Sequence, residues 1–282
     1  GSKGKHEGAA PAIRFYSTKR ACPSCARSFP ELDPRLFSYN SKHGWCPDCV
    51  GTGLALTREQ RLALDDSQQD DNRGREQTFA EPEVEDVEDV ECGTCHGARL
   101  NAVARKKRYL GYSDAGSLLA GMYRAGFEHL AHGPMASDSV RDDATAKGAL
   151  AWLTTGRTDW IEPSLAGDPR PAVAFNLTII DQLVGTDLEP DLSGHVLMLE
   201  EVSEAAYRID RMMFHLTGQA SIRRVAGIRL GRVSDVTPND PDFGQTAEQI
   251  VSHWCLRSGI PFLGSADIGH DAANKVVPFG RP

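Results

Sequence analysis

The sequence predicts an α/β fold for the C-terminal portion and an irregular, metal-bound module for the N-terminal portion. Three observations carry this prediction. From residue 109 onward, short apolar runs alternate with stretches of helical apolar spacing, which is typical of layered α/β proteins. Between residues 22 and 95, six of the seven cysteines form three Cys-x-x-Cys pairs. The 282 residues, 40% hydrophobic and 25% charged, are enough for two ordinary domains.

The N-terminal third divides into stretches of different character. Residues 1–13 are rich in Gly, Ala and Lys, which predicts a disordered tail. Residues 14–53 are dense in Cys, Pro, Gly and aromatic residues, and residues 56–64 predict a short helix. Residues 65–91 are polar and end in a run of Glu and Asp. Because such a charge run repels itself and stays extended, it predicts a solvated acidic linker.

The rest of the chain alternates strands with helices, so a sheet with helices packed against it is expected. A loop containing Gly and Pro at 165–171 interrupts the pattern, and the segment 172–183 is mixed in character. The predicted strands are 109–113, 195–199, 224–230 and 260–263, and the predicted helices are 115–125, 144–153, 205–216 and 246–256.

Charge and cysteine content restrict the function classes and the compartment. The net charge of −8 argues against a surface that contacts many phosphates, although a local basic patch remains compatible with it. No run of about eighteen apolar residues occurs, so a membrane is not an expected partner. Seven cysteines without a secretory signal favour metal ligands in a cytoplasmic protein over a disulfide framework. Cys255, far from the pairs, is expected to be a leftover thiol.

The cysteine pairs predict a structural zinc site. Two residues between thiolates allow a tight turn to present both sulfurs to one tetrahedral ion, at about 2.3 Å per bond. Unmetallated thiols or an iron–sulfur cluster is the alternative. Six ligands exceed four, so either one pair is idle or it joins a second site, completed by His43, by His96 or by a part of the protein not present here. The six candidate ligands are Cys22, Cys25, Cys46, Cys49, Cys92 and Cys95.

The N-terminal portion resembles the zinc-binding region of the excision-repair protein UvrA over residues 14–105. This resemblance implies zinc-dependent architecture and DNA or a repair protein as partner. It does not extend to ATPase activity, because the chain contains no Gly-x-x-x-x-Gly-Lys-Ser/Thr phosphate loop. The segments that carry the resemblance are 15–23, 31–41, 46–53 and 92–101.

Three polar residues in the C-terminal portion are candidates for acyl-transfer chemistry. Ser113 follows a predicted strand and opens a predicted helix, so it is either a nucleophile on a strained elbow or a plain helix N-cap. Glu200 ends an apolar strand and His270 follows a glycine, and each alone could be an ordinary strand-end or turn residue. Together, a serine, a carboxylate and an imidazole are the three parts of a catalytic triad.

Residues 106–282 resemble the LD-carboxypeptidase (muramoyl-tetrapeptide carboxypeptidase) family of serine peptidases. The resemblance implies Ser113 as nucleophile, His270 as general base and Glu200 as the carboxylate that orients it, with Glu201 as the fallback. It also implies the N–H of Asp114 as one oxyanion donor, and removal of a terminal D-amino acid from cell-wall muropeptides. The motifs that carry it are 108–114, 132–135, 176–178, 199–204, 207–212, 237–240, 269–270 and 277–280.

This chain also departs from the LD-carboxypeptidase pattern. The N-terminal strands of the family, the source of a second oxyanion donor, are replaced by the zinc segment, and the Gly-Gly expected before Asn176 is Ala174-Phe175. We therefore expect a fusion of a tail (1–13), a zinc module (14–105), a partial nucleophile-elbow domain (106–168) and a C-terminal domain (169–282). Low stability is expected for 107–159 unless the zinc segment covers it.

Three functions stay open for such a fusion. The first is a serine carboxypeptidase acting on muropeptides. The second is a zinc-dependent DNA-repair or partner-binding fragment without ATPase activity, and the third is an inactive fusion. A homodimer is also left open.

Overall fold

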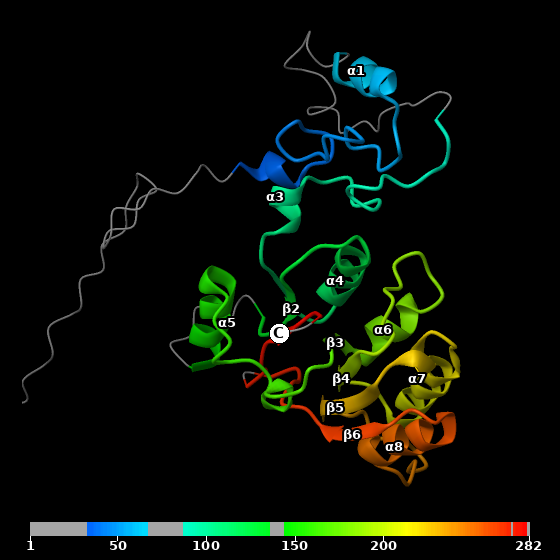
Figure 1. The fold of residues 1–282 in the computed structure, drawn as a ribbon. Coiled ribbons are helices and arrows are strands. Elements are labelled where there is room, and N and C mark those ends of the chain that lie inside the picture. The colour runs from blue at the N-terminus through cyan, green and yellow to red at the C-terminus, as the bar shows by residue number, and fades with distance from the viewer. Residues whose placement is uncertain (1–32, 67–86, 136–143, 272, 281–282) are drawn as a thin grey trace, which may run out of the picture.

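The computed structural model describes residues 33–66, 87–135, 144–271 and 273–280, and Figure 1 shows their arrangement. The cysteine-rich segment lies at one end of the molecule and leads through the short helix α3 (Ala102–Arg105) into the α/β part. The predicted tail, most of the acidic linker, and the first cysteine pair, Cys22 and Cys25, lie outside the described residues.

The cysteine-rich segment contains little regular structure, as predicted. Its described helices are η1 (Pro34–Phe37) and α1 (Arg58–Asp66), the latter displaced by two residues from the predicted 56–64. Two isolated antiparallel bridges, Trp45 to Leu100 and Leu54 to Glu91, connect its two halves. Turns and these bridges therefore hold together a segment whose own apolar core is small.

A four-stranded parallel sheet forms the centre of the α/β part, in the order β3-β4-β5-β6. Because connections between neighbouring parallel strands are right-handed, strands added in one direction place their crossover helices on the same face, as Figure 1 shows. The strands are β3 (Ala172–Asn176), β4 (Val196–Val202), β5 (Gly227–Ser234) and β6 (Phe262–Ser265), and the helices between them are α6 (Leu177–Leu183), α7 (Ala206–Gly218) and α8 (Ala247–Ser258).

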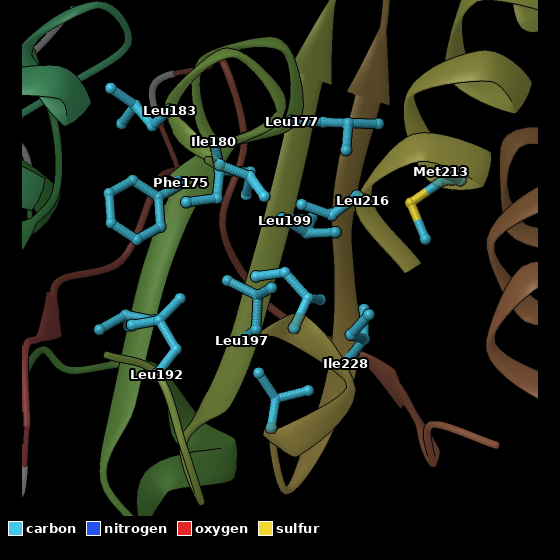
Figure 2. Packing of buried hydrophobic residues seen from close by; sticks show 14 of the residues in the cluster. Phe175, Leu177, Ile180, Leu183, Leu192, Leu197, Leu199, Met213, Leu216 and Ile228 are labelled. Carbon is cyan, nitrogen blue, oxygen red and sulfur yellow. The ribbon is translucent and has the colours of Figure 1, made fainter. Parts of the chain in front are cut away.

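The main hydrophobic core lies between this sheet and its helices (Figure 2). Phe175, Leu197 and Leu199 point to the helical face, where they join Met213 of α7. Alternate residues such as Met198 belong to a smaller cluster on the opposite face. The strands β3 and β4 are buried along nearly their whole length, which explains why β3 and the first half of β4 read as continuous apolar runs. Full burial of each large side chain contributes about 1.5–3 kcal/mol.

A second, three-stranded sheet carries the segment that contains Ser113. Its strands are ordered β1-β2-β7, with β1 parallel to β2 and β7 antiparallel to β2. The C-terminal segment links the two sheets, because Gly280 pairs with Ala172 at the start of β3. The elements are β1 (Tyr109–Gly111), α4 (Ala115–Arg124), β2 (Leu130–His132), α5 (Ala144–Thr155) and β7 (Val277–Pro278).

Several boundaries differ from the sequence-based expectation. The mixed segment 172–183 resolves into β3 and α6 without an intervening residue, because Asn176 ends the strand and caps the helix through its side chain. The strand expected at 224–230 begins at Gly227, preceded by the short helix η4 (Ile222–Arg224). The loop expected at 165–171 follows the short helix η3 (Pro163–Leu165). Within the described part of the chain, no helix is both long and apolar enough to cross a bilayer.

The cysteine-rich segment contacts the beginning of the α/β part. The ring of Phe37 meets that of Tyr109 edge-on at 6.1 Å between centroids, and Leu100 packs against the main core. The hydroxyl of Tyr109 donates to the carbonyl of Ala104 at 2.9 Å, and the carbonyl of Arg105 accepts from the N–H of Glu128 at 3.0 Å. The segment therefore covers part of the surface around β1.

Candidate active site and thiolate cluster

Ser113 lies in the turn between β1 and α4, at the carboxyl end of the strand. Its φ of 52° places it in the left-handed region, which is uncommon for a residue other than glycine. Gly111, two residues earlier, permits this turn to pack closely, since a Cβ there would lie 2.8 Å from Leu119. The following residue, Asp114, is the N-cap of α4 but makes no side-chain cap. A strained serine between strand and helix is the geometry of a nucleophile elbow.

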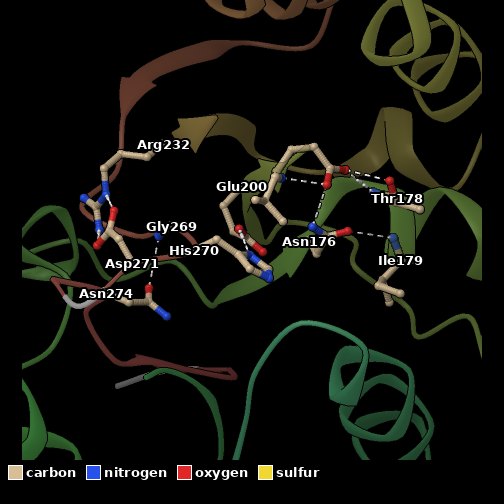
Figure 3. A network of polar contacts seen from close by, with 11 residues as sticks. Asn176, Thr178, Ile179, Glu200, Arg232, Gly269, His270, Asp271 and Asn274 are labelled. Carbon is tan, nitrogen blue, oxygen red and sulfur yellow. Dashed lines mark hydrogen bonds and ion pairs between the residues drawn. The ribbon is translucent and has the colours of Figure 1, made fainter. Parts of the chain in front are cut away.

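His270 and Glu200 meet through the Nδ1 atom of the ring and Oε2 of the carboxylate, at 2.7 Å (Figure 3). Glu200 comes from the carboxyl-terminal half of β4, and His270 from the loop between β6 and β7. An ionised carboxylate only accepts hydrogen bonds, so this contact places a proton on Nδ1 and leaves Nε2 able to accept one. This is the orientation that a general base needs.

Glu200 is fully buried, and burial is the largest influence on its titration. Burial raises the pKa of Glu200, and the hydrogen bond with His270 offsets only part of that effect. The second carboxylate oxygen, Oε1, accepts from no residue that the structure describes. His270 is therefore the main partner that offsets the burial of this carboxylate, with a smaller contribution from the side chain of Asn176.

Glu201, the next residue, holds the start of α6 through hydrogen bonds to both of its carboxylate oxygens. Its Oε1 accepts from Nδ2 of Asn176 at 2.8 Å and from the N–H of Val202 at 2.9 Å. Its Oε2 accepts from both the N–H and the hydroxyl of Thr178, at 2.8 and 2.7 Å. Both oxygens of the Glu201 carboxylate thus accept hydrogen bonds around the start of α6, whereas the Glu200 carboxylate contacts His270.

Tyr112 brings the serine turn next to the histidine. Its ring lies 4.5 Å from that of His270 between centroids, and 6.0 Å from the ring of His132 on β2. His132 is buried, neither ring nitrogen has a partner in the described residues, and burial lowers its pKa to about 4. His132 begins the motif 132–135, but nothing in the sequence assigns it a role, because a buried neutral histidine carries no sequence signal of its own.

Four cysteines of the N-terminal segment form a buried thiolate cluster. The Sγ atoms of Cys46, Cys49, Cys92 and Cys95 all lie within 4.8 Å of one another. Cys49 and Cys95 are 3.6 Å apart at sulfur, close to the separation of about 3.8 Å in a tetrahedron with 2.3 Å metal–sulfur bonds. The second and third cysteine pairs thus come together, and the group includes neither His43 nor His96.

The two turns of the thiolate cluster are joined by polar contacts outside the sulfurs. The hydroxyl of Thr94 donates to Asp48 at 2.6 Å, and Arg61 donates to the same carboxylate at 3.2 Å. Burial raises the pKa of Cys46 to about 11, whereas the hydrogen bond with Cys95 lowers the pKa of Cys49 to about 5. One thiolate is therefore favoured in the cluster, but ionising Cys46 as well requires a cation. The donor set and its spacing are compatible with a metal site.

The comparisons with known proteins separate the chain into two parts. Residues 171–282 match the family model described as the LD-carboxypeptidase C-terminal domain. A protein of Synechocystis named as a carboxypeptidase is 30% identical over 187 residues, which are 64% of this chain and 60% of that protein. The chain therefore spans about 60% of the length of this curated relative.

Solved structures agree on the fold of the same part. The crystal structure of muramoyltetrapeptide carboxypeptidase from Oxalobacter formigenes superposes with a TM-score of 0.52 and 25% identity, covering 62% of this chain and 63% of that one. The mixed α/β fold with its parallel sheet is thus the fold of these carboxypeptidases.

A different protein matches a shorter segment of the chain. The UvrABC system protein A of Treponema pallidum is 42% identical over 64 residues, 23% of this chain and 7% of that protein. The four clustered cysteines are consistent with a zinc module like that of UvrA. The chain thus joins a segment similar to UvrA to a C-terminal part, residues 171–282, that matches the LD-carboxypeptidase C-terminal domain.

Proposed function

We propose that the α/β part is a serine carboxypeptidase that removes a terminal D-amino acid from cell-wall muropeptides. The observation that carries this proposal is the 2.7 Å contact between His270 and Glu200 beside a serine turn held at φ 52°. The similarity to LD-carboxypeptidases supplies the substrate class.

In the proposed reaction, Oγ of Ser113 attacks the carbonyl carbon of the scissile amide while Nε2 of His270 takes the hydroxyl proton. The C–N bond then breaks, and His270 gives the proton to the leaving amine, which departs as the D-amino acid. Water activated by the same imidazole hydrolyses the acyl-enzyme and restores Ser113. Glu200 keeps the proton on Nδ1 and stabilises the imidazolium in both steps.

The N–H of Asp114, next after the nucleophile, is the proposed oxyanion donor. It donates to no described acceptor, so it is available for the negatively charged oxygen of the tetrahedral intermediate. Loss of one such donor typically costs about a hundredfold or more in rate.

An active-site serine probe tests this proposal directly. The full chain is treated with a fluorophosphonate, and D-alanine release from an L,D-linked muropeptide is followed in parallel. Labelling and release should disappear in Ser113→Ala and His270→Ala and persist in Ser117→Ala, which removes a hydroxyl one turn further along. Labelling that survives Ser113→Ala would contradict the assignment.

For the N-terminal segment, we propose that Cys46, Cys49, Cys92 and Cys95 hold one structural Zn²⁺. The mutual approach of four buried sulfurs within 4.8 Å favours this reading. Bound zinc would neutralise part of the thiolate charge and supply on the order of 10 kcal/mol of folding free energy to the segment. Reduced thiolates of this kind also favour a cytoplasmic location.

A second candidate function belongs to this zinc segment: binding of DNA or of a repair protein, without ATPase activity. The similarity to UvrA favours it. Fluorescence anisotropy with duplex DNA tests it, and binding should weaken in salt and in Cys92→Ser. If the folded chain shows neither DNA or partner binding nor serine labelling, the third interpretation, an inactive fusion, is correct.

A further inference from the structure

The loop that carries His270 is flanked by two carboxylates that share one cation. Asp267 and Asp271 both contact the guanidinium of Arg232, a half-buried residue of β5. Nη1 of Arg232 donates to Asp267 at 2.6 Å, and Nη2 donates to Asp271 at 3.0 Å, with Nε as a further donor to Asp271. Figure 3 shows the pairing with Asp271 next to His270. The planar guanidinium of Arg232 therefore contacts one residue before His270 and one residue after it.

The backbone of β5 approaches the same loop closely. The N–H of Arg232 donates to the carbonyl of Ile268 at 2.8 Å. A Cβ at Gly269 would lie 2.8 Å from Cβ of Arg232, so a glycine is required for this approach. Asn274, which is fully buried, accepts from the N–H of Gly269 at 3.1 Å through its side chain. Gly269, the residue before His270, is thus held between strand β5 and the later loop residue Asn274.

The two flanks of the loop are not held equally. Asp267 has other attachments, since its N–H donates to the buried Glu162 at 3.0 Å and its carbonyl accepts from the N–H of Lys275 at 3.1 Å. Asp271 has one ion-pair partner among the described residues, Arg232, and its other contacts are local: its side chain accepts from the N–H of Ala273 at 2.8 Å and its carbonyl from the N–H of Asn274 at 3.3 Å. The flank that follows His270 therefore depends more on the guanidinium.

We propose that Arg232 is a positioning residue, whose contacts with Asp267 and Asp271 keep Nδ1 of His270 on Glu200 and so leave Nε2 available to accept a proton. Its catalytic consequence rests on the proposed serine-peptidase function. Arginine suits this task because its guanidinium engages two carboxylates in fixed directions, whereas a lysine ammonium can hold only one of them closely.

The test compares Arg232→Met and Arg232→Lys with Arg229→Met in the full chain. Arg229 is the matched control, because it lies on the same strand and donates to the carbonyls of Leu263 and Ser265 rather than to the His270 loop. Asp271→Asn serves as a second variant that keeps the side-chain volume. The first readout is the imidazole N–H resonance of His270 in histidine-labelled protein, assigned with His270→Gln. The second is the rate of fluorophosphonate labelling.

We expect the hydrogen-bonded Nδ1–H resonance of His270 to disappear or shift in Arg232→Met and in Asp271→Asn, and to remain in Arg229→Met. The labelling rate should fall by about 10- to 100-fold in Arg232→Met, with Arg232→Lys intermediate, because small misplacements of a catalytic group have effects of this size. A resonance and rate for Arg232→Met that match those of Arg229→Met would overturn the proposal. The resonance is visible even in an inactive chain, so absence of wild-type labelling refutes the peptidase function without deciding the positioning role.

Discussion

His270 and Glu200 lie 70 positions apart in the chain and meet at 2.7 Å between Nδ1 and Oε2. The carboxylate has no exposed surface, whereas 17% of the imidazole remains exposed. A buried carboxylate is costly unless it is paired, and Oε1 of Glu200 has no described donor. The pair is therefore arranged so that the histidine faces the solvent side and the carboxylate supports it from within.

The first prediction concerns stability against pH. Burial raises the pKa of Glu200 in the folded protein above its ordinary value of 4.5. The folded state thus keeps this proton to higher pH than the unfolded state does. The contribution of Glu200 to the free energy of unfolding is therefore most favourable below about pH 4.5 and is lost as pH rises through the folded pKa. The loss is about 1.4 kcal/mol for each unit by which the folded pKa exceeds the unfolded one.

Urea unfolding of the wild type and Glu200→Gln across this pH range checks that prediction. The free energy of unfolding of the wild type, relative to the variant, should fall as pH rises above 4.5. Parallel curves for the two proteins would show that the carboxyl does not titrate abnormally.

The second prediction separates the two adjacent carboxylates. Glu200→Gln should lower the fluorophosphonate labelling rate of Ser113 by about 10³-fold or more, because an amide holds the wrong histidine tautomer. Glu201→Gln should leave that rate nearly unchanged and lower the free energy of unfolding by about 1–3 kcal/mol, since it disturbs the donors of Asn176, Thr178 and Val202. The reverse pattern would make Glu201 the orienting residue.

Labelling kinetics and chemical denaturation of both variants provide the comparison. The two changes have the same chemistry and neighbouring positions, so each is the other's control.

Long, strongly patterned elements of this fold were predictable from the sequence. The bounds of α7, α8 and β4 lie within a few residues of the predicted ones. Their apolar residues follow a pattern over many positions, and such a pattern is the strongest sequence signal of secondary structure. The strands β2 and β7 were not predicted, since two or three residues are too few for a period to show. Their pairing is set by tertiary contacts instead.

The candidate site was also predictable in part. The residue types of Ser113, Glu200 and His270 and the family motifs pointed to them, with Glu201 as the fallback carboxylate, but the contact that distinguishes the two carboxylates appears only in the folded chain. Both carboxylates follow the same apolar run, and only the backbone decides which one faces His270. Arg232 was missed because its partners lie 35 and 39 residues away in sequence.

The third prediction concerns the thiolate cluster. Cys92→Ser should reduce the zinc content by one ion per chain and lower the thermal stability of the N-terminal segment, because three thiolates and a hydroxyl form a poor site. Cys255→Ser is the control: this buried thiol of α8, whose pKa burial raises to about 12, lies in the main core. That change should weaken the core and leave the zinc content unaltered.

Elemental analysis after dialysis, with and without a chelator, measures the zinc content. Equal zinc in Cys92→Ser and the wild type would mean that these four sulfurs do not hold the ion.

The fourth prediction decides how firmly the segment before the four-stranded sheet is packed. The sequence predicts low stability for 107–159 unless the zinc segment covers it, yet the structure packs α5 against Trp160. An added Cβ at Gly148 would overlap the indole ring of Trp160, which itself packs against Nζ of Lys275 at 3.8 Å. If α5 is docked as the structure shows, Gly148→Ala should lower the free energy of unfolding by about 1–3 kcal/mol.

The matched change is Gly218→Ala at the end of α7, where an added Cβ would meet nothing within 4 Å. Alanine there should be neutral or stabilise the protein by up to about 1 kcal/mol, because it restricts the unfolded chain. Urea denaturation of both variants gives the comparison. If Gly148→Ala is as harmless as Gly218→Ala, α5 is not held against Trp160 in solution, and the low stability predicted for 107–159 is correct. A selective loss for Gly148→Ala means instead that α5 and Trp160 keep this segment packed.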